Sequence, residues 1–452
     1  MCGVAAWLGE RAWEAVYWML LGLQHRGHDA AGIAALHGGH IHVTGGKGLV
    51  AEALGSASPP KAAGLAIGHV RYSTSGGYEE YQPVPSPRGK LVIAYNGNIV
   101  NYVEAYRELL GGEPPQWDAA AVAAILERLY LEEGSLVDAV RAAGRLLRGA
   151  YSLVAATSSG ELLAARDPAG IRPLAYSLGD GYVAVASESG VLSSMGLQWH
   201  ELGAGTLLYC HGETRDCSVE FFAPTTGPYP CAFEYIYLMR PDSVFEGIPV
   251  HSARRRMGEL LAARDDVDAD LVVAVPDSGR SAAIGYASAR GLPLDEAIYV
   301  NRFAGRSFIA NPFIRSRIVE AKYSVVPGVV ENKRVVAVDD SIVRGSTVRR
   351  IVRLLRAAGA REVHFRSAAP PVIAPCFFGV DIPTRSELIA HGRSVEEIAG
   401  ATGADTVLYG TLGDLQRATG LPRLCMGCFT GDYPLKPLEP EFLESRFSRG
   451  RR

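Results

Sequence analysis

The sequence lacks the features that would place it in a membrane or nucleic-acid class. No apolar stretch is long enough to cross a bilayer, and the apolar segment near the start is interrupted by Glu10, Arg11 and Glu14. We therefore expect neither a signal peptide nor a membrane partner. Basic charge is not in excess, since 45 Lys and Arg face 48 Asp and Glu, which argues against a nucleic-acid partner. These absences predict a soluble, cytoplasmic protein.

Cysteine, asparagine and glutamine are also scarce. Seven cysteines in 452 residues are too few for a disulfide scaffold. Cys210 and Cys217 flank a turn-like HGETRD and could pair in a hot organism, but we expect two free thiols there. Asn and Gln together number 11, which is a weak sign of heat adaptation.

The length allows two or three domains, and the pattern changes halfway along the chain. The first half combines helical periodicity over Ala12–Leu23 and Ala119–Glu132 with short strand candidates between Gly-rich turns. The strand candidates are Leu65–Arg71, Leu91–Tyr95, Tyr151–Thr157, Leu162–Arg166 and Tyr182–Ser187. This mixture predicts stacked antiparallel sheets covered by helices.

The second half follows a segment typical of a linker, APTTGPYP at 223–230. Its apolar runs Leu271–Val275 and Val335–Val338 are each followed by a loop and then a helix. This order predicts a parallel sheet with helices on both faces.

Cys2 is the first residue that indicates a chemistry. A small residue at position 2 permits removal of Met1, which would leave Cys2 with both a thiol and an α-amine. The amine titrates near ~8 and a free thiol near ~8.5, so the amine can take the proton of the thiol at neutral pH. The alternative is that Cys2 only begins a buried strand.

Further motifs follow Cys2 in a fixed order. They are LQHRGHDAAGI at 23–33, HVRYST at 69–74, YNGN at 95–98 and Asp118 at the start of a helix. At these residues the chain resembles the glutamine amidotransferases with an N-terminal nucleophile cysteine, over most of residues 2–220. The resemblance implies an α+β N-terminal-nucleophile hydrolase domain, with the αββα arrangement of stacked antiparallel sheets. His28 departs from the family, which commonly has Gln there.

The same resemblance implies a role for each motif residue. Cys2 would attack the γ-amide carbon of glutamine, and its α-amine would carry the proton. Asn96 and Gly97 would supply the oxyanion donors, each typically worth ~3 kcal/mol of barrier. Arg71 would bind the α-carboxylate of glutamine and Asp118 its α-ammonium. Taken alone, Arg71 could be a strand-edge charge, Asp118 a helix N-cap and Asn96-Gly97 a hairpin turn.

A second motif, VVAVDDSIVRGST at 335–347, predicts a phosphate site. A buried strand delivers two carboxylates at its carboxyl end, where open α/β sheets bind ligands. The following loop opens a helix that we expect to run to about Ala358, and its amides and hydroxyls suit a phosphate. The Gly-Lys-Ser/Thr of a Walker loop is absent. An ordinary strand-turn-helix with solvated acids is the alternative.

This motif resembles the phosphoribosyl pyrophosphate (PRPP) site of the α/β type I phosphoribosyltransferases. The resemblance implies that Asp339 and Asp340 hold the ribose hydroxyls and one Mg2+ per subunit, with Ser278 of VPDSG near the metal. It also implies a 5′-phosphate cradle formed by Ser341, Val343, Arg344, Gly345, Ser346 and Thr347.

Residues 301–323 carry five basic side chains with little apolar periodicity, namely Arg302, Arg306, Arg315, Arg317 and Lys322. A solvated loop is one interpretation. The resemblance implies a lid that closes over PRPP, excludes water and binds it through Arg302 and Lys322. Glu320 stands where the family has a basic residue.

Four further cysteines, Cys231, Cys376, Cys425 and Cys428, lie in the words CAFEYIY, CFFGVDIPTR and CMGCFTG. These are the positions at which a subset of the amidophosphoribosyltransferases ligates a 4Fe–4S cluster. The resemblance therefore implies one structural cluster per subunit. Zinc in the same four-thiolate shell is the second choice.

The two halves together resemble the amidophosphoribosyltransferase family over nearly the whole chain. The resemblance implies a glutamine amidotransferase domain at 1–224 and a phosphoribosyltransferase domain at 225–452. Ammonia from glutamine would pass internally to C1 of PRPP, giving 5-phosphoribosylamine, pyrophosphate and glutamate, the first committed step of purine synthesis. Purine nucleotides would inhibit a homo-oligomer, a dimer or a tetramer, and the glutaminase would be nearly silent without PRPP.

Two alternatives remain at this point. The glutaminase could feed another acceptor, as in glucosamine-6-phosphate synthase, but the PRPP motif argues against it. The second half could be a PRPP-sensing module, as in some purine repressors. The retained Cys2, Arg71 and Asn96, and the lack of a basic DNA-binding region, argue against that.

Overall fold

The computed structural model describes residues 2–57, 60, 63–72, 80–212, 214, 216–225, 227–301, 322–382 and 384–435. Arg302, Arg306, Arg315, Arg317 and Glu320, on which part of the lid prediction rests, lie outside the described residues.

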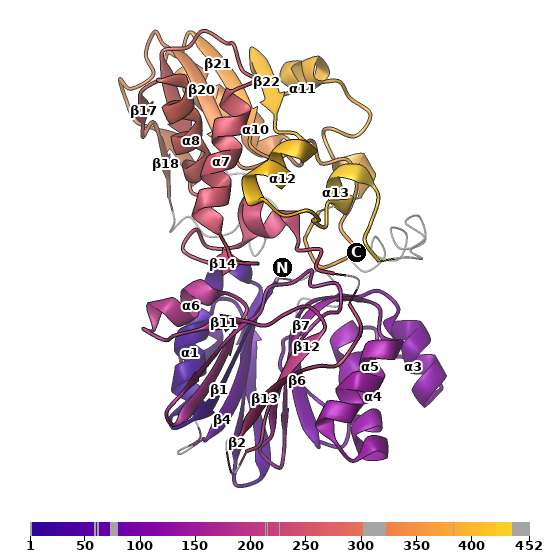
Figure 1. The fold of residues 1–452 in the computed structure, drawn as a ribbon. Coiled ribbons are helices and arrows are strands. Elements are labelled where there is room, and N and C mark those ends of the chain that lie inside the picture. Colours follow the sequence, from indigo (N-terminus) through magenta and orange to yellow (C-terminus); the bar gives the residue numbers. More distant parts are fainter. Residues whose placement is uncertain are drawn as a thin grey trace.

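Two antiparallel sheets form the first half (Figure 1). The seven-stranded sheet has the order β11-β9-β10-β1-β4-β2-β3 and the six-stranded sheet the order β13-β12-β8-β7-β6-β5. The first contains β1 (Gly3–Gly9), β2 (Ala30–His37), β3 (His40–Lys47), β4 (Leu65–Arg71), β9 (Ala175–Gly179), β10 (Tyr182–Ala186) and β11 (His200–Glu201). The second contains β5 (Val84–Pro85), β6 (Leu91–Ile99), β7 (Gly149–Thr157), β8 (Leu162–Arg166), β12 (Thr206–Cys210) and β13 (Cys217–Phe221).

Helices cover the outer face of each sheet. The seven-stranded sheet packs against α1 (Ala12–Gly22), α2 (Val50–Leu54) and α6 (Ser189–Ser194), and a short 3-10 turn, η1 (Gln24–Arg26), follows α1. The six-stranded sheet packs against α3 (Tyr102–Leu110), α4 (Asp118–Glu133) and α5 (Leu136–Leu146). The expected αββα arrangement is confirmed.

The sequence of β1 explains why it lies inside this sandwich. Val4, Ala6 and Leu8 contribute to the core between the two sheets, whereas Ala5 contributes to the core beneath α1. Successive side chains of a strand point to opposite faces, so a strand that is apolar at every position can be buried on both. Cys2 is thereby fixed at the end of a fully buried strand.

A parallel sheet forms the second half, in the order β17-β16-β20-β21-β22. Its strands are β16 (Leu271–Ala274), β17 (Leu294–Asp295), β20 (Arg334–Asp339), β21 (Glu362–Ser367) and β22 (Thr406–Tyr409). One face is covered by α7 (Val250–Ala262), α8 (Arg280–Arg290) and α12 (Leu412–Thr419), the other by α10 (Ser346–Ala357) and α11 (Val395–Thr402). The predicted doubly wound sheet is confirmed.

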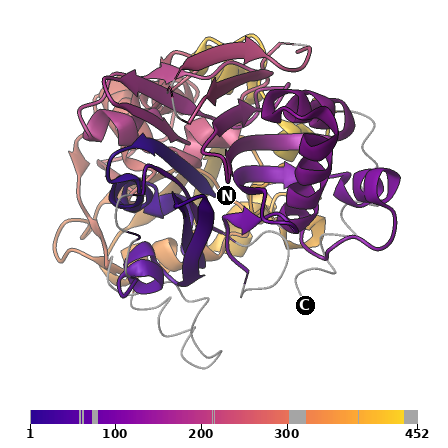
Figure 2. The same cartoon turned by 90° about the horizontal axis from the view of Figure 1, so that it is seen from below.

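Short elements connect these layers. They are the π-helix η2 (Glu234–Leu238), the hairpin β14 (Val244–Phe245) and β15 (Ile248–Pro249), the pair β18 (Ile298–Val300) and β19 (Tyr323–Val325), the turn η3 (Arg385–Glu387) and α13 (Gly427–Thr430). Figure 1 shows the N-terminus at the end of the sandwich that faces the second half. Figure 2 shows the same terminus between strands of the first half, seen from below.

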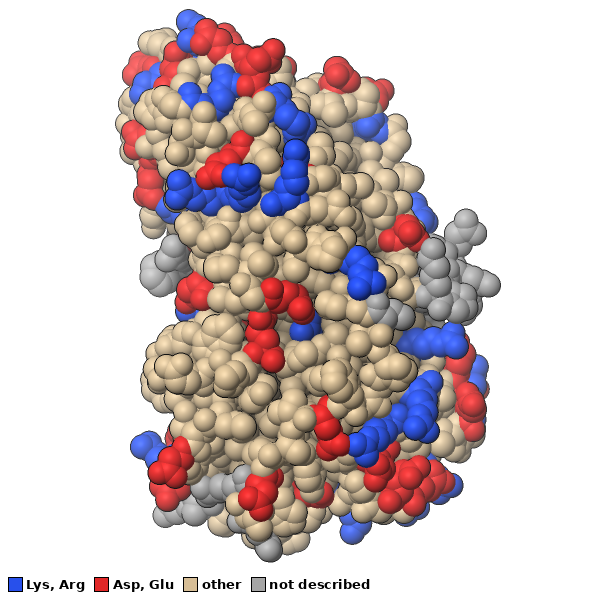
Figure 3. All heavy atoms as spheres, in the orientation of Figure 1, with Lys and Arg blue, Asp and Glu red and all other residues tan. Residues whose placement is uncertain are grey.

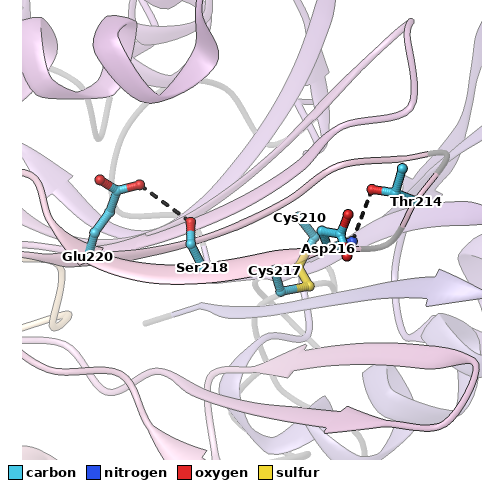
Figure 4. The surroundings of a disulfide bond; sticks show 6 residues. All are labelled: Cys210, Thr214, Asp216, Cys217, Ser218 and Glu220. Atoms are coloured by element: carbon cyan, nitrogen blue, oxygen red, sulfur yellow. Dashed lines mark hydrogen bonds between the residues drawn. A yellow bond between two sulfur atoms is a disulfide. The ribbon is translucent and has the colours of Figure 1, made fainter.

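The expectation of free thiols at positions 210 and 217 was wrong. Cys210 and Cys217 form a disulfide across β12 and β13 (Figure 4). The two residues are direct partners in the antiparallel register, and their Cα atoms are 4.2 Å apart, within reach of a disulfide. The turn was visible in the sequence, but the pairing register that it sets was not.

Figure 3 shows acidic and basic groups in neighbouring positions over both halves of the face drawn. Within the described ranges, no helix has the length and apolar character needed to span a membrane.

Candidate active site

The amidotransferase motif residues converge at the end of the sandwich. Cys2 precedes β1, Arg71 ends β4, Asn96 and Gly97 lie in β6, and Asp118 begins α4. One cleft is lined by Cys2, Arg71, Tyr72, Gln82, Tyr95, Gly97, Trp117 and Asp118. The sequence-predicted residues thus meet in one place although more than 100 positions separate the first from the last.

The surroundings of Cys2 favour a thiolate. Burial alone would raise the pKa of the Cys2 thiol, but the chain-terminal ammonium and then His69 outweigh burial and lower the pKa to about 6. The thiol also points at the carbonyl of Tyr72, with 3.7 Å between Sγ and the oxygen. A cysteine with this pKa is largely ionised at neutral pH and therefore nucleophilic.

Asn96 is oriented by Cys2 itself. The backbone N–H of Cys2 donates to Asn96 Oδ1 at 3.2 Å, which fixes the amide and directs its nitrogen elsewhere. Asn96 is fully buried, and among the described residues its Nδ2 has no hydrogen-bond partner. An unused buried donor is costly, and it is what an oxyanion site requires before substrate arrives.

Gly97 follows with a conformation that only glycine adopts readily. Its φ is +146°, and an added Cβ would lie 1.9 Å from the carbonyl oxygen of Ala150 in the neighbouring strand. The backbone of β6 can therefore approach both β7 and the cleft at this position.

Arg71 and Asp118 line the same cleft as Cys2. The Arg71 guanidinium lies 5.3 Å from the centre of the Trp117 ring and 3.6 Å from the carboxylate of Glu80. Asp118 accepts hydrogen bonds from the Tyr95 hydroxyl and from the N–H of Ala119. Burial, followed by the charge of Asp118, raises the pKa of Tyr95. The cleft that holds the thiol thus also holds a cation and an anion.

Four residues of this cleft, Tyr72, Gln82, Tyr95 and Trp117, were given no role from the sequence. Tyr72 and Trp117 directly adjoin Arg71 and Asp118, so proximity along the chain could have indicated them. The side-chain amide of Gln82 bonds the backbone of Tyr95: its Oε1 accepts from the Tyr95 N–H at 2.8 Å and its Nε2 donates to the Tyr95 carbonyl at 3.5 Å. No local pattern around Gln82 predicts this contact.

The predicted PRPP residues lie at the carboxyl end of β20. Asp339 and Asp340 are 6% and 8% exposed, and Asp340 accepts hydrogen bonds from the hydroxyls of Ser278 and Ser341. Burial and then the proximity of Asp340 raise the pKa of Asp339, and burial raises the pKa of Asp340. Two buried carboxyls that disfavour ionisation side by side fit a site for a hard divalent cation.

The loop after this acid pair turns sharply into α10. Gly345 has a φ of +74°, and an added Cβ would lie 2.3 Å from a side-chain carbon of Ile389. Ser346 and Thr347 form the first turn of α10, whereas Val343 accepts a backbone hydrogen bond from Ile389 at 2.9 Å. The loop therefore leads from the acid pair into the N-terminus of α10, where the sequence predicts a phosphate site.

The basic residues predicted to bind PRPP have different contacts in the structure. Arg344 donates to Glu387 at 3.1 Å. The Lys322 ammonium lies 5.1 Å from the centre of the Tyr323 ring, and its charge acts on Asp339. Arg302 lies outside the described residues.

The four later cysteines come from three distant segments that meet. Cys231 and Cys425 face each other in an isolated parallel bridge, and the carbonyl of Cys428 accepts the N–H groups of Ile373 and Ala374 at 3.0 and 3.1 Å, just before Cys376. None of the four is in a disulfide. Burial and the neighbouring cysteines raise the pKa values of Cys425 and Cys428.

The type of donor in this gathering, four thiols, suits a bound metal group. Cys231, Cys425 and Cys428 are buried and Cys376 is partly buried, and thiols become metal ligands only when they lose their protons. However, within the described part of the chain no three His, Cys, Asp or Glu side chains are grouped closely enough to hold a single metal ion.

The two halves touch directly beside the thiol cleft. Asn98 Nδ2 donates to the carbonyl of Phe377 at 2.7 Å, and the Tyr72 hydroxyl donates to Asp381 at 3.2 Å. Residues 377–381 of the second half are therefore packed against the strand that carries Asn96 and Gly97.

Comparisons with known proteins agree with this geometry. A family model described as a glutamine amidotransferase domain matches residues 59–208. The amidophosphoribosyltransferase of Bacillus subtilis (strain 168) is 42% identical over 451 residues, covering 96% of this chain and 94% of the relative. The amidophosphoribosyltransferase of Archaeoglobus fulgidus is 40% identical, covering 96% and 98%.

Solved structures resemble the whole chain as well. The Bacillus subtilis glutamine PRPP amidotransferase, in complex with ADP and GMP, has a TM-score of 0.87 at 39% identity, covering 97% of this chain and 98% of that one. A second structure, described as the allosteric regulatory enzyme of purine biosynthesis, has a TM-score of 0.88 at 40% identity, covering 98% and 99%.

Proposed function

The chain belongs to the amidophosphoribosyltransferase family, and on that premise we propose a role for each residue of the two sites. The chain is a purine-biosynthesis enzyme with glutamine amidotransferase activity that uses glutamine and PRPP. Feeding ammonia to a different acceptor, or serving only as a sensor, is therefore set aside.

We propose that glutamine is hydrolysed in the cleft at Cys2. Arg71 binds the α-carboxylate and Asp118 the α-ammonium, which places the γ-amide at the thiol. The Cys2 thiolate attacks the amide carbon, and the C–N bond breaks as the α-amine of Cys2 delivers a proton to the leaving ammonia. Water then cleaves the resulting thioester, which releases glutamate and restores the thiol. Asn96 Nδ2 and the Gly97 N–H stabilise the oxyanion. The observation that carries this proposal is the buried, unused Asn96 Nδ2 next to Cys2.

Ammonia then reacts at C1 of PRPP. We propose that Asp339 and Asp340 hold the ribose hydroxyls and one Mg2+ with Ser278, while Ser341, Val343, Arg344, Gly345, Ser346 and Thr347 hold the 5′-phosphate. Mg2+, when bound, neutralises charge on the departing pyrophosphate. Lys322 and Arg302 belong to the proposed lid. The domain boundary proposed at 224/225 follows β13, the last strand of the sandwich in sequence, which ends at Phe221.

The test measures pyrophosphate release with both substrates and Mg2+. Release that requires glutamine and PRPP supports the proposal, and none with both present contradicts it. Cys2→Ala should lose glutamine-driven synthesis and keep synthesis from added ammonia, because only the first site is altered. Glutamine hydrolysis that is equal with and without PRPP would contradict the proposed silence of the glutaminase.

We propose further that Cys231, Cys376, Cys425 and Cys428 ligate one structural 4Fe–4S cluster per subunit, supported by the convergence of their three segments and by the burial of all but Cys376. Iron and acid-labile sulfide should both be found in anaerobically prepared protein at cluster stoichiometry. Zinc without sulfide would favour the second choice.

We also propose a cytoplasmic homo-oligomer, a dimer or a tetramer, inhibited by purine nucleotides. The support for inhibition is that the Bacillus subtilis relative was solved with ADP and GMP. Light scattering and synthesis assays with added AMP and GMP test these statements.

A further inference from the structure

Four charged side chains lie fully buried where the two halves meet, outside the substrate residues named above. Arg26 is 2% exposed, and Arg172, Glu188 and Glu234 are each 0% exposed. Charges are buried this deeply only when each has partners that replace water. The hydrogen-bond partners of these four side chains therefore show which groups they hold in position.

The Arg26 guanidinium connects this cluster to Cys2. Its Nε donates to the carbonyl oxygen of Cys2 at 2.8 Å. Its Nη1 donates to Glu188 at 2.6 Å and to Glu234 at 3.0 Å, and its Nη2 donates to the other Glu234 oxygen at 2.7 Å. Because the guanidinium is planar and rigid, two carboxylates on one edge fix the direction of the bond to Cys2 on the other.

The two carboxylates come from different halves of the molecule. Glu188 directly precedes α6 of the sandwich. Glu234 begins η2, a π-helix of the second half whose N-terminal N–H bonds the carbonyl of Cys231 at 3.1 Å. Arg172 Nη1 donates to Glu234 at 3.0 Å, so Glu234 binds two arginines of the first half.

The helix that carries Glu234 is itself held by the second half. Arg254 of α7 donates through Nε to the carbonyl of Tyr235 at 2.5 Å and through Nη2 to that of Met239 at 2.8 Å. The helix that carries Glu234 is thus held in position by α7 of the second half, and not by strands β1 and β4 of the sandwich.

We propose that Glu234 is a positioning residue for Cys2: by fixing Arg26 on the Cys2 carbonyl, it sets the direction of the thiol and α-amine toward the glutamine amide. The inference rests on the proposed glutaminase role of Cys2. It implies that the nucleophile is correctly placed only when the second half contributes this carboxylate. Misplacement of a nucleophile by about 1 Å can reduce turnover about 100-fold.

The experiment compares wild type with Glu234→Gln, Glu234→Asp and Asp265→Asn in the full-length enzyme. In Glu234→Gln an amide NH2 faces guanidinium N–H groups, so one bond to an arginine is lost while size is kept. Glu234→Asp keeps both oxygens one methylene further back. Asp265 is the matched control, because its carboxylate also forms an ion pair with an arginine, the buried Arg366 of the second half, and is not bonded to Cys2.

Three readouts separate positioning from general damage. They are kcat and KM for glutamine-driven synthesis, the rate of ammonia-driven synthesis, and the pH profile of Cys2 alkylation followed by peptide mass. We expect Glu234→Gln to lower the glutamine kcat about 100-fold and leave ammonia-driven synthesis within twofold. The alkylation midpoint should move to higher pH. Glu234→Asp should recover part of the kcat, and Asp265→Asn should change neither route.

Two results would overturn the proposal. One is a glutamine kcat in Glu234→Gln within threefold of wild type. The other is an equal fall of both routes, which would make Glu234 merely structural. If Glu234→Gln does not fold, Glu234→Asp decides by the same criteria. Failure of the wild type to release pyrophosphate would instead refute the proposed function.

Discussion

Replacing Asn96 tests the oxyanion assignment most directly. Its Oδ1 accepts the Cys2 N–H at 3.2 Å, and its Nδ2 has no partner among the residues that the structure describes. Asn96→Ala removes one oxyanion donor, which is worth about 3–4 kcal/mol, or 100- to 1,000-fold in kcat. The KM for glutamine should change little, because Arg71 and Asp118 bind the opposite end of the substrate.

The assay is glutamate formation at saturating PRPP and Mg2+, with ammonia-driven synthesis measured on the same protein. Asn96→Asp keeps the acceptor for Cys2 but has no donor and adds a negative charge, so its kcat should fall at least as far. Asn101→Ala is the matched control, since its amide bonds Leu146 and Arg148 in the same domain at 2.9 and 2.7 Å. A kcat for Asn96→Ala within threefold of wild type would refute the reasoning.

Three further predictions concern Cys2, Asp339 and the Cys210–Cys217 disulfide. Alkylation of Cys2 should rise through a midpoint near pH 6, because its pKa is lowered to about 6 and the thiolate fraction grows as pH rises through that value; a midpoint near ~8.5, that of a free thiol, would contradict it. Asp339→Asn should abolish synthesis from either nitrogen donor. It should also make the metal-free enzyme more heat-stable at neutral pH, because it removes one of two neighbouring buried carboxyls that repel each other when charged. Calorimetry with and without Mg2+ measures this change, and Mg2+ should stabilise only the wild type. Reducing Cys210–Cys217, whose loop ends are 7 positions apart, should cost about 2.5 kcal/mol and lower Tm by about 5–10 °C, whereas Cys210→Ser/Cys217→Ser should not respond to reductant.

Much of the fold could be predicted because its signals are local. The predicted strands at 65–71 and 162–166 coincide with β4 and β8, and the helix predicted over 119–132 lies within α4. Alternation of period 2 and helical periodicity depend on neighbouring residues alone. The acid pair of β20 was equally visible, since a strand, two carboxylates and a glycine turn are contiguous in sequence.

The features that escaped prediction depend on tertiary pairing. The Cys210–Cys217 disulfide follows from a strand register, and Gln82 reaches Tyr95 from a loop. Arg26 and Glu234 are 208 positions apart, and nothing near either residue indicates the other. A sequence pattern states which residues an element presents, whereas the packing of elements decides what those residues meet.

Several contacts between the halves lie next to residues of the proposed glutaminase site. Asn98, two positions after Asn96 on β6, donates to Phe377, and Arg172 donates to the carbonyl of Phe378 as well as to Glu234. Phe377 and Phe378 directly follow Cys376, and Glu234 lies three positions after Cys231. The segments that bring the four cysteines together are therefore the same segments that support the oxyanion strand and the Cys2 carbonyl. Packed interiors transmit displacement with little compliance. We therefore expect a mutation that loosens the four-cysteine site to lower the rate of glutamine hydrolysis before it disturbs the acid pair at the end of β20.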